Sequence, residues 1–132
     1  MKSLCGPEDP DTLNKAVSIS IILTKLERFA ELADFVRPET ALARRALGDD
    51  HEITLRLRHH YAHALLDGLR VSGVSLADAP REPAFIEAKA EIEDVHRRMK
   101  RILGAMHPYT KVAAGLLARF RLVEKEAKRS VG

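Results

Sequence analysis

Tryptophan is absent from this chain of 132 residues, and aromatic residues make up only 5% of it. A core therefore has to be built mainly from Leu, Ile, Val and Ala, as in stacked helices. Because Cys5 is the only cysteine, no internal disulfide can form, and a reducing, cytoplasmic location is expected. The N-terminus lacks the apolar run of a signal peptide. The longest apolar stretch, residues 17–26, is interrupted by Ser, Thr and Lys, so no membrane partner is expected.

Acidic residues are scarce near the C-terminus. Residues 97–132 contain 10 Lys and Arg against 2 Asp and Glu, whereas residues 1–96 contain 12 against 17. A basic segment can attract acidic protein, RNA or a membrane surface, but a charge run is more often the solvated end of a helix. The patch lacks the interleaved aromatic residues that stack on bases, so nucleic acid is not an expected partner. Its members are Arg97, Arg98, Lys100, Arg101 and Lys111.

One short motif occurs twice, with a weaker third copy near the N-terminus. Residues 47–54 (LGDDHEIT) and 103–110 (LGAMHPYT) share Leu, Gly, His and Thr in the same register, and residues 5–12 (CGPEDPDT) form a weaker copy. The threonines Thr12, Thr54 and Thr110 are therefore 42 and 56 residues apart. The motif residues expected to have a structural role at these junctions are Gly48, His51, Thr54, Gly104, His107, Pro108 and Thr110.

Local physical chemistry explains the motif as a boundary between two helices. Glycine is common just after a helix end, where a positive φ is required. Proline suits the first turn of the next helix because its missing N–H would have no partner there. Asp9 is a good N-cap before Pro10, and Asp50 or His51 is expected to cap the helix after the second copy.

The segments between these junctions have helical periodicity. The pattern predicts helices over residues 13–26 and 35–47, with an interruption at Pro38, and over residues 55–66, ending near Gly68. Residues 70–83, which hold two prolines and a glycine, are expected to form a loop. Two further helices are predicted over residues 85–103 and from Pro108 to about Lys128.

With these residues identified, the chain resembles tetratricopeptide repeats (TPR) of the kinesin light chain type. That family has a 42-residue period, an L-G-x-x-H-P-x-T junction and a small residue eight positions after the threonine. In this chain the residues eight positions after Thr12, Thr54 and Thr110 are the small residues Ser20, Ala62 and Ala118. Phe85, Glu87 and Ala88 match the family pattern of its second helix, as do Phe29 and Glu31. The chain departs from the family pattern at Leu32, where the family has Ala, and at Pro38 and Glu39. It also lacks the histidine of the first junction and carries 14 additional residues within 70–83.

The resemblance implies an all-α fold in which antiparallel helix pairs stack as a short TPR-like α-solenoid, in one domain spanning residues 1–132. Repeat 1 is expected over about 10–48 and repeat 2 over about 51–104, with an inserted loop at 70–83. A closing helix follows over about 108–129. Fewer than three full repeats leave an apolar face uncovered. A homodimer or a place within a longer repeat array is therefore expected.

The resemblance also implies a function, that of a protein-interaction module rather than an enzyme. In TPR arrays the first helix of each pair lines a concave groove, which here would favour an acidic peptide segment or a partner protein. The alternative within this class is an array that only spaces its neighbours. The groove residues implied by the family geometry are Asn14, Lys25, Arg56, His59, His63, Asp67 and Arg119.

The sequence also contains residues that fit two other chemistries. Arg58 and His63 have the spacing that small helical ribonucleases of the HEPN class use, Arg for phosphate and His for proton transfer. His59 and His63 share a helix face and could ligate a metal, and Glu93 with His96 has the E-x-x-H spacing of di-iron bundles. The ligand sets are incomplete, so neither a metal nor a cofactor is expected.

Overall fold

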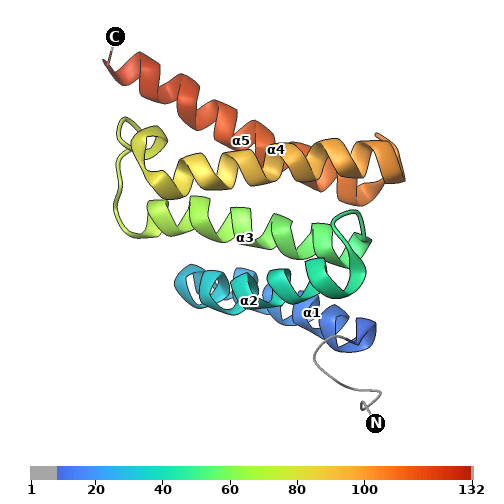
Figure 1. Ribbon diagram of the computed structural model, residues 1–132. Coiled ribbons are helices and arrows are strands. Elements are labelled where there is room, and N and C mark those ends of the chain that lie inside the picture. Colours follow the sequence, from blue (N-terminus) through green and yellow to red (C-terminus); the bar gives the residue numbers. More distant parts are fainter. Residues whose placement is uncertain (1–8, 132) are drawn as a thin grey trace.

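The computed structural model describes residues 9–131, which form five α-helices and one turn of 3-10 helix. Their bounds are α1 (Pro10–Lys25), α2 (Phe29–Leu47), α3 (Glu52–Val71), η1 (Ala79–Arg81), α4 (Pro83–Leu103) and α5 (Pro108–Val131). Consecutive helices run in opposite directions and stack side by side (Figure 1). No strand occurs among the described residues. The predicted all-α stack of antiparallel helix pairs is therefore confirmed.

The two complete junctions have the same local structure. Gly48 and Gly104 end α2 and α4 with φ of 94° and 93°, a region that is open to glycine and strained for other residues. Nδ1 of His51 and Nδ1 of His107 each accept a hydrogen bond of 3.1 Å from the backbone N–H two residues later. Each histidine thus caps the helix that follows. Of the two caps predicted for α3, His51 and not Asp50 occupies the position.

Asp9 takes the same place at the first junction. Its Oδ1 accepts a hydrogen bond of 2.8 Å from the backbone N–H of Asp11, and Pro10 is the first residue of α1. Cys5 and Gly6, at the start of this copy, lie outside the described residues. An Asp cap and a His cap satisfy the same free N–H group, so the weaker copy has the same function as the other two.

The predicted interruption at Pro38 is wrong, because α2 continues through it without a break. Proline removes one backbone hydrogen bond, which normally weakens a helix. Here the ring is exposed, while Val36, Thr40 and Ala43 on the opposite side of the helix are buried. Packing of this apolar face holds the helix across the missing bond.

The boundaries around the inserted segment also differ from those predicted. α3 passes Gly68 and ends at Val71. A Cβ added at Gly68 would lie at an ordinary contact distance, 4.0 Å, from Cβ of Phe29, so this glycine does not mark the end of the helix. The expected loop at 70–83 is shorter, since its ends belong to α3 and α4 and Ala79–Arg81 forms a helical turn. The segment that remains, residues 72–82, is called the insertion below.

The core consists of two apolar clusters that meet at α3. One cluster joins α3 to α1 and α2, and the other joins α3 to α4 and α5. In the second cluster the rings of Phe85 and Phe120 lie 5.0 Å apart between their centroids. On α3, the first cluster contains Leu57, Tyr61 and Ala64, and the second contains Leu55, Ala62 and Leu66. Because α3 is buried from both sides, it fixes the positions of α1 and α2 on one side and of α4 and α5 on the other.

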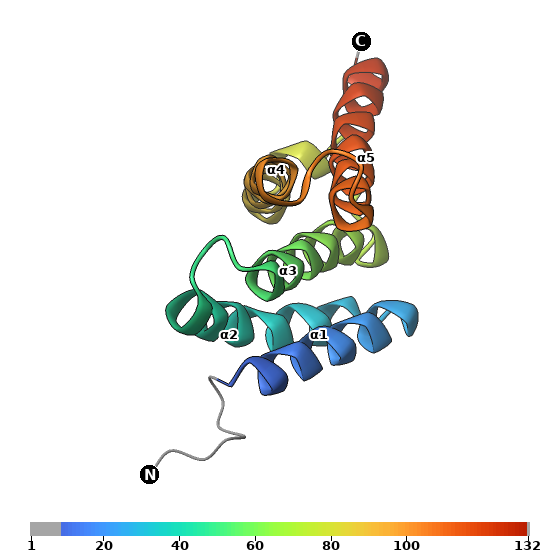
Figure 2. The same ribbon diagram turned by 90° about the vertical axis from the view of Figure 1, so that its right-hand side faces the viewer.

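The helices alternate between two faces of the stack. Figure 2 shows α1, α3 and α5 on one side, named here the odd-helix face, and α2 and α4 on the other, the even-helix face. Ile19 and Ile22 of α1 are 43% and 55% exposed, whereas Tyr61 and Ala64, the residues 42 positions later, are covered by packing against α2. The outer side of α1 is therefore an apolar helix face that no helix of the described chain covers.

Candidate functional site

All seven residues predicted to line a groove belong to α1, α3 and α5. Asn14 and Lys25 are exposed on α1. The other five form two groups between α3 and α5. Arg56 and His59 border a cavity, and His63, Asp67 and Arg119 form an ion cluster further along both helices.

The first group surrounds a small, largely apolar hollow of about 220 Å³, named here the Arg56 cavity. The guanidinium of Arg56 lies 4.5 Å from the centroid of the Tyr109 ring, so a cation and an aromatic face form one wall. No carboxylate among residues 9–131 is paired with Arg56. The lining residues are Ile21, Arg56, His59, His60, Met99, Tyr109 and Val112.

Two neighbouring histidines give this cavity an uncharged polar wall. Burial, together with the charges of His60, His63 and Arg56, lowers the pKa of His59 to about 3. Burial, followed by the charges of His63 and Arg56, lowers the pKa of His60 to about 4. Both rings are therefore neutral at pH 7. Nδ1 of His60 is buried without a hydrogen-bond partner among the described residues, which leaves one polar atom for which a bound group could supply a partner.

The second group is centred on the buried carboxylate of Asp67. Nε2 of His63 lies 2.5 Å from its Oδ2, and the two terminal nitrogens of Arg119 donate to its oxygens at 2.5 and 3.2 Å. Burial alone would raise the pKa of Asp67, but the hydrogen bonds from His63 and Arg119 hold it well below the usual range. The bidentate pair fixes α5 to α3 across 52 residues of sequence.

The charges on the odd-helix face are unequal. Asp67 is buried and fully paired, whereas Arg119 is 46% exposed and both Arg56 and Lys25 reach the surface. No ion pair of Lys25 or Arg56 is found within the described part of the chain. Of the seven predicted groove residues, the charged groups that face solvent are therefore all cationic.

The even-helix face carries a second group of charged residues that the sequence reasoning missed. It surrounds a cleft of about 690 Å³ between α2 and α4, with α3 as its floor. Tyr61 donates a hydrogen bond of 2.6 Å to Glu87 and accepts one of 3.1 Å from Arg37. Arg58 is only 3% exposed and pairs with Glu91 at 2.9 Å and with Asp94 at 2.8 Å.

The signal that could have revealed this network is an arginine on the apolar face of a helix. Arg58 lies three residues after Leu55 and four before Ala62, both fully buried, where a charge requires partners. Carboxylates at helical spacing on the following helix, Glu91 and Asp94 among them, supply these partners. The network joins the two repeats, so its geometry explains it as a structural feature.

The residues of the ribonuclease hypothesis and of the basic patch are also engaged in ion pairs. Arg58 pairs with the carboxylates of Glu91 and Asp94, whereas His63 pairs with Asp67. The basic patch is partly neutralised, since Arg98 pairs with Asp50 at 2.6 Å and Arg101 pairs with the same residue at 3.0 Å.

Neither a metal-binding cluster nor a membrane-spanning helix occurs within residues 9–131. No group of three or more His, Cys, Asp or Glu side chains there could hold a metal ion. No helix in that range is long and apolar enough to cross a membrane. No family model, curated protein or solved structure matches the chain.

Proposed function

We propose that this protein is an interaction module, of the TPR type that its junction motifs resemble, and that its odd-helix face binds an acidic segment of a partner protein. The observation that carries the proposal is the Arg56 cavity. It combines a small apolar hollow, an unpaired guanidinium at its wall and an unpartnered histidine nitrogen on one side of the stack. A hollow of this kind is typical of a site that binds one side chain of a ligand.

The charges support an acidic partner. Arg56, Lys25 and Arg119 are cationic and reach solvent, and the one predicted groove carboxylate, Asp67, is buried. Such a surface attracts a negatively charged segment and repels a positive one, most strongly at low salt. Because His59 and His60 are neutral at pH 7, the wall that they form is uncharged and does not repel an apolar side chain.

The test is capture of partners from a cell lysate by immobilised wild-type protein and by Arg56→Glu, with quantitative mass spectrometry. Arg56 is preferred to Arg119 because reversing Arg119 would also break its pair with buried Asp67. Arg45→Glu is the matched control, because Arg45 is an exposed arginine on the even-helix face. We expect a partner that Arg45→Glu retains and Arg56→Glu loses by about ten-fold or more.

Two other outcomes would contradict the proposal. Equal loss in both variants would show that binding depends on overall charge and not on the cavity. Equal recovery in all three would favour an array that only spaces its neighbours.

The uncovered face of α1 supports the accompanying proposal that another helix packs there, from a second copy or from a longer array. Ile19, Ile22 and Leu26 follow helical spacing and are all exposed. Light scattering of the purified chain is the direct measurement. A dimer that Ile22→Glu dissociates would assign this face to a second copy, and a stable monomer at high concentration would count against self-association.

A further inference from the structure

The insertion builds a second apolar cavity on the odd-helix face, about 340 Å³ in volume. Val74, Leu76 and Ala79 of the insertion form one wall, the end of α3 forms the floor, and α5 forms the other wall. The cavity is named here the Leu76 cavity, after a leucine that is 53% exposed at its edge. Its lining residues are Leu66, Asp67, Leu69, Arg70, Val74, Leu76, Ala79, Arg119 and Val123.

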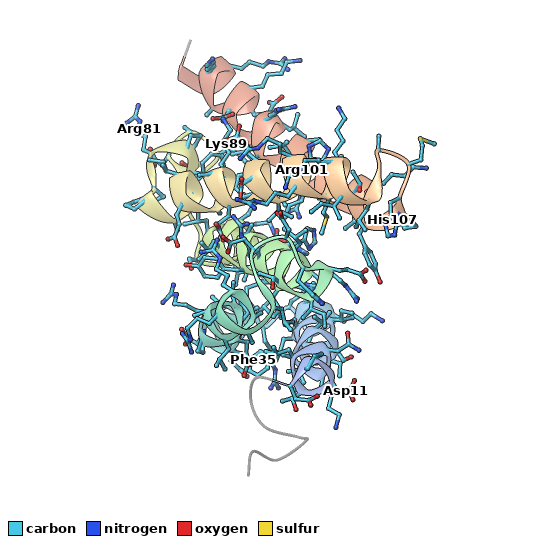
Figure 3. The ribbon with its side chains drawn as sticks, turned by 45° about the vertical axis from the view of Figure 1, so that its right-hand side comes forward. Asp11, Phe35, Arg81, Lys89, Arg101 and His107 are labelled. Carbon is cyan, nitrogen blue, oxygen red and sulfur yellow. The ribbon has the colours of Figure 1, made fainter. Side chains whose placement is uncertain are left out.

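The Leu76 cavity is in line with the Arg56 cavity, since both lie between α3 and α5. These two helices run in the same direction (Figure 1), and on both of them the residues that line the second cavity follow those of the first by about ten positions. Figure 3 places Arg81, which belongs to the insertion, and His107, whose ring lies 4.9 Å from that of Tyr109 in the Arg56 cavity, toward opposite ends of α4. Ten helical residues span about 15 Å.

The Asp67 ion cluster borders the Leu76 cavity, which Asp67 and Arg119 help to line, and its third member, His63, lies on α3 between the residues of the two cavities. Its carboxylate is satisfied by His63 and Arg119, so it holds α3 to α5 without presenting a negative charge to solvent. The exposed charged groups near the second cavity are Arg70, which pairs with exposed Glu27 at 3.1 Å, and Arg119, which pairs with Asp67. These two arginines are balanced by Glu27 and Asp67, so the net positive charge along the two cavities comes from the unpaired Arg56. A segment that spans the two cavities therefore crosses a surface of net positive charge, which fits an acidic chain.

We infer that the occupant is one extended acidic segment with two apolar side chains, one for each cavity. Extended chain rises about 3.3 Å per residue, so a distance of about 15 Å corresponds to anchors four or five positions apart. This inference rests on the proposed function and adds a second subsite with a defined spacing. The insertion, residues 72–82, then has a role in recognition, because it supplies the wall of that subsite.

Synthetic peptides test the inference without knowledge of the natural partner. The probes are fluorescein-labelled peptides of Ser, Gly and Glu that contain two leucines one to eight positions apart, with single-leucine peptides for comparison. Affinity is measured by fluorescence anisotropy at low salt. We expect the tightest binding at a spacing of four or five, at least about ten-fold tighter than with one leucine, because each anchor buries a full side chain.

Two variants at exposed positions separate the subsites. Leu76→Glu blocks the second cavity and Val112→Glu the first, and Ile86→Glu, an equally exposed apolar residue of α4 outside both, is the matched control. Each blocking variant should weaken the best two-leucine peptide about ten-fold and abolish the spacing preference, whereas the control should leave both unchanged.

The failures of the two proposals are distinguishable. If Val112→Glu weakens binding but Leu76→Glu does not, or if affinity is independent of spacing, the second subsite is wrong and the proposed groove stands. If no acidic peptide binds better than a Lys-containing analogue, both proposals are overturned.

Discussion

Acidification should destabilise this protein well before its carboxylates titrate. The folded pKa values of His59 and His60 are about 3 and about 4, whereas an unfolded histidine titrates near 6.5. Below that pH the unfolded chain binds protons that the folded chain does not. The contribution of both residues is therefore complete above about pH 7 and is lost progressively as the pH falls from 6.5 toward 4.

The magnitude follows from these values. At pH 5 each unfolded histidine is almost fully protonated and each folded one is almost fully neutral, which corresponds to about 1.5 pKa units, or about 2 kcal/mol, per residue. The two together remove about 4 kcal/mol between pH 8 and pH 5. The pKa of His96 is also lowered, chiefly by burial, which acts in the same direction. A domain of this size has a total stability of about 5–15 kcal/mol, so the loss is large.

Urea denaturation followed by circular dichroism, at pH 8, 7, 6 and 5, measures this effect. The wild type should lose stability most steeply between pH 6 and pH 5. The double variant His59→Gln/His60→Gln, whose side chains do not titrate, should start lower but show a much smaller dependence on pH. An equally steep loss in the double variant, or a wild type whose stability is constant from pH 8 to pH 5, would refute the reasoning.

Three further predictions concern the junctions and the helix interfaces. Gly48→Ala should destabilise the protein by about 1–3 kcal/mol, because alanine is strained at the positive φ of this position. Gly115→Ala, inside α5 with free space around it, should instead stabilise the protein by about 1 kcal/mol. If thermal melts show melting temperatures that shift in the same direction for both variants, the reasoning is contradicted. Tyr61→Phe should cost about 1–3 kcal/mol in urea denaturation, because it removes the hydroxyl bonded to both α2 and α4. Thr54→Val and Thr110→Val should be neutral or stabilise the protein by about 1 kcal/mol, since each buried hydroxyl lacks a hydrogen-bond partner among the described residues. A stability loss above about 1 kcal/mol in the thermal melt of either variant would show that its hydroxyl does form a hydrogen bond.

The junctions were predictable from sequence because their physics is local. A glycine with positive φ, a capping side chain and a proline in the first turn act within a few residues of one another, and Gly104, His107 and Pro108 occupy the expected places. The helix through Pro38 was not predictable in this way, because packing across the stack compensates for the hydrogen bond that proline removes.

The candidate site was predictable only in part. The family geometry placed Arg56 and His59 on one face, and they do border one cavity. It could not reveal that Arg119 pairs with Asp67, because that contact depends on the spacing between α3 and α5. Nor could it reveal that the insertion forms a wall of the Leu76 cavity, since that wall forms only when residues 72–82 fold against α5.

The central claim is that the odd-helix face binds an acidic segment, and the most direct test is an NMR titration of isotopically labelled protein with the best two-leucine peptide. The account predicts that the largest chemical shift changes occur at Ile21, Arg56, Val112 and Leu76, with little change around Arg45 on α2. Changes confined to α2 and α4, or none at millimolar peptide, would contradict it.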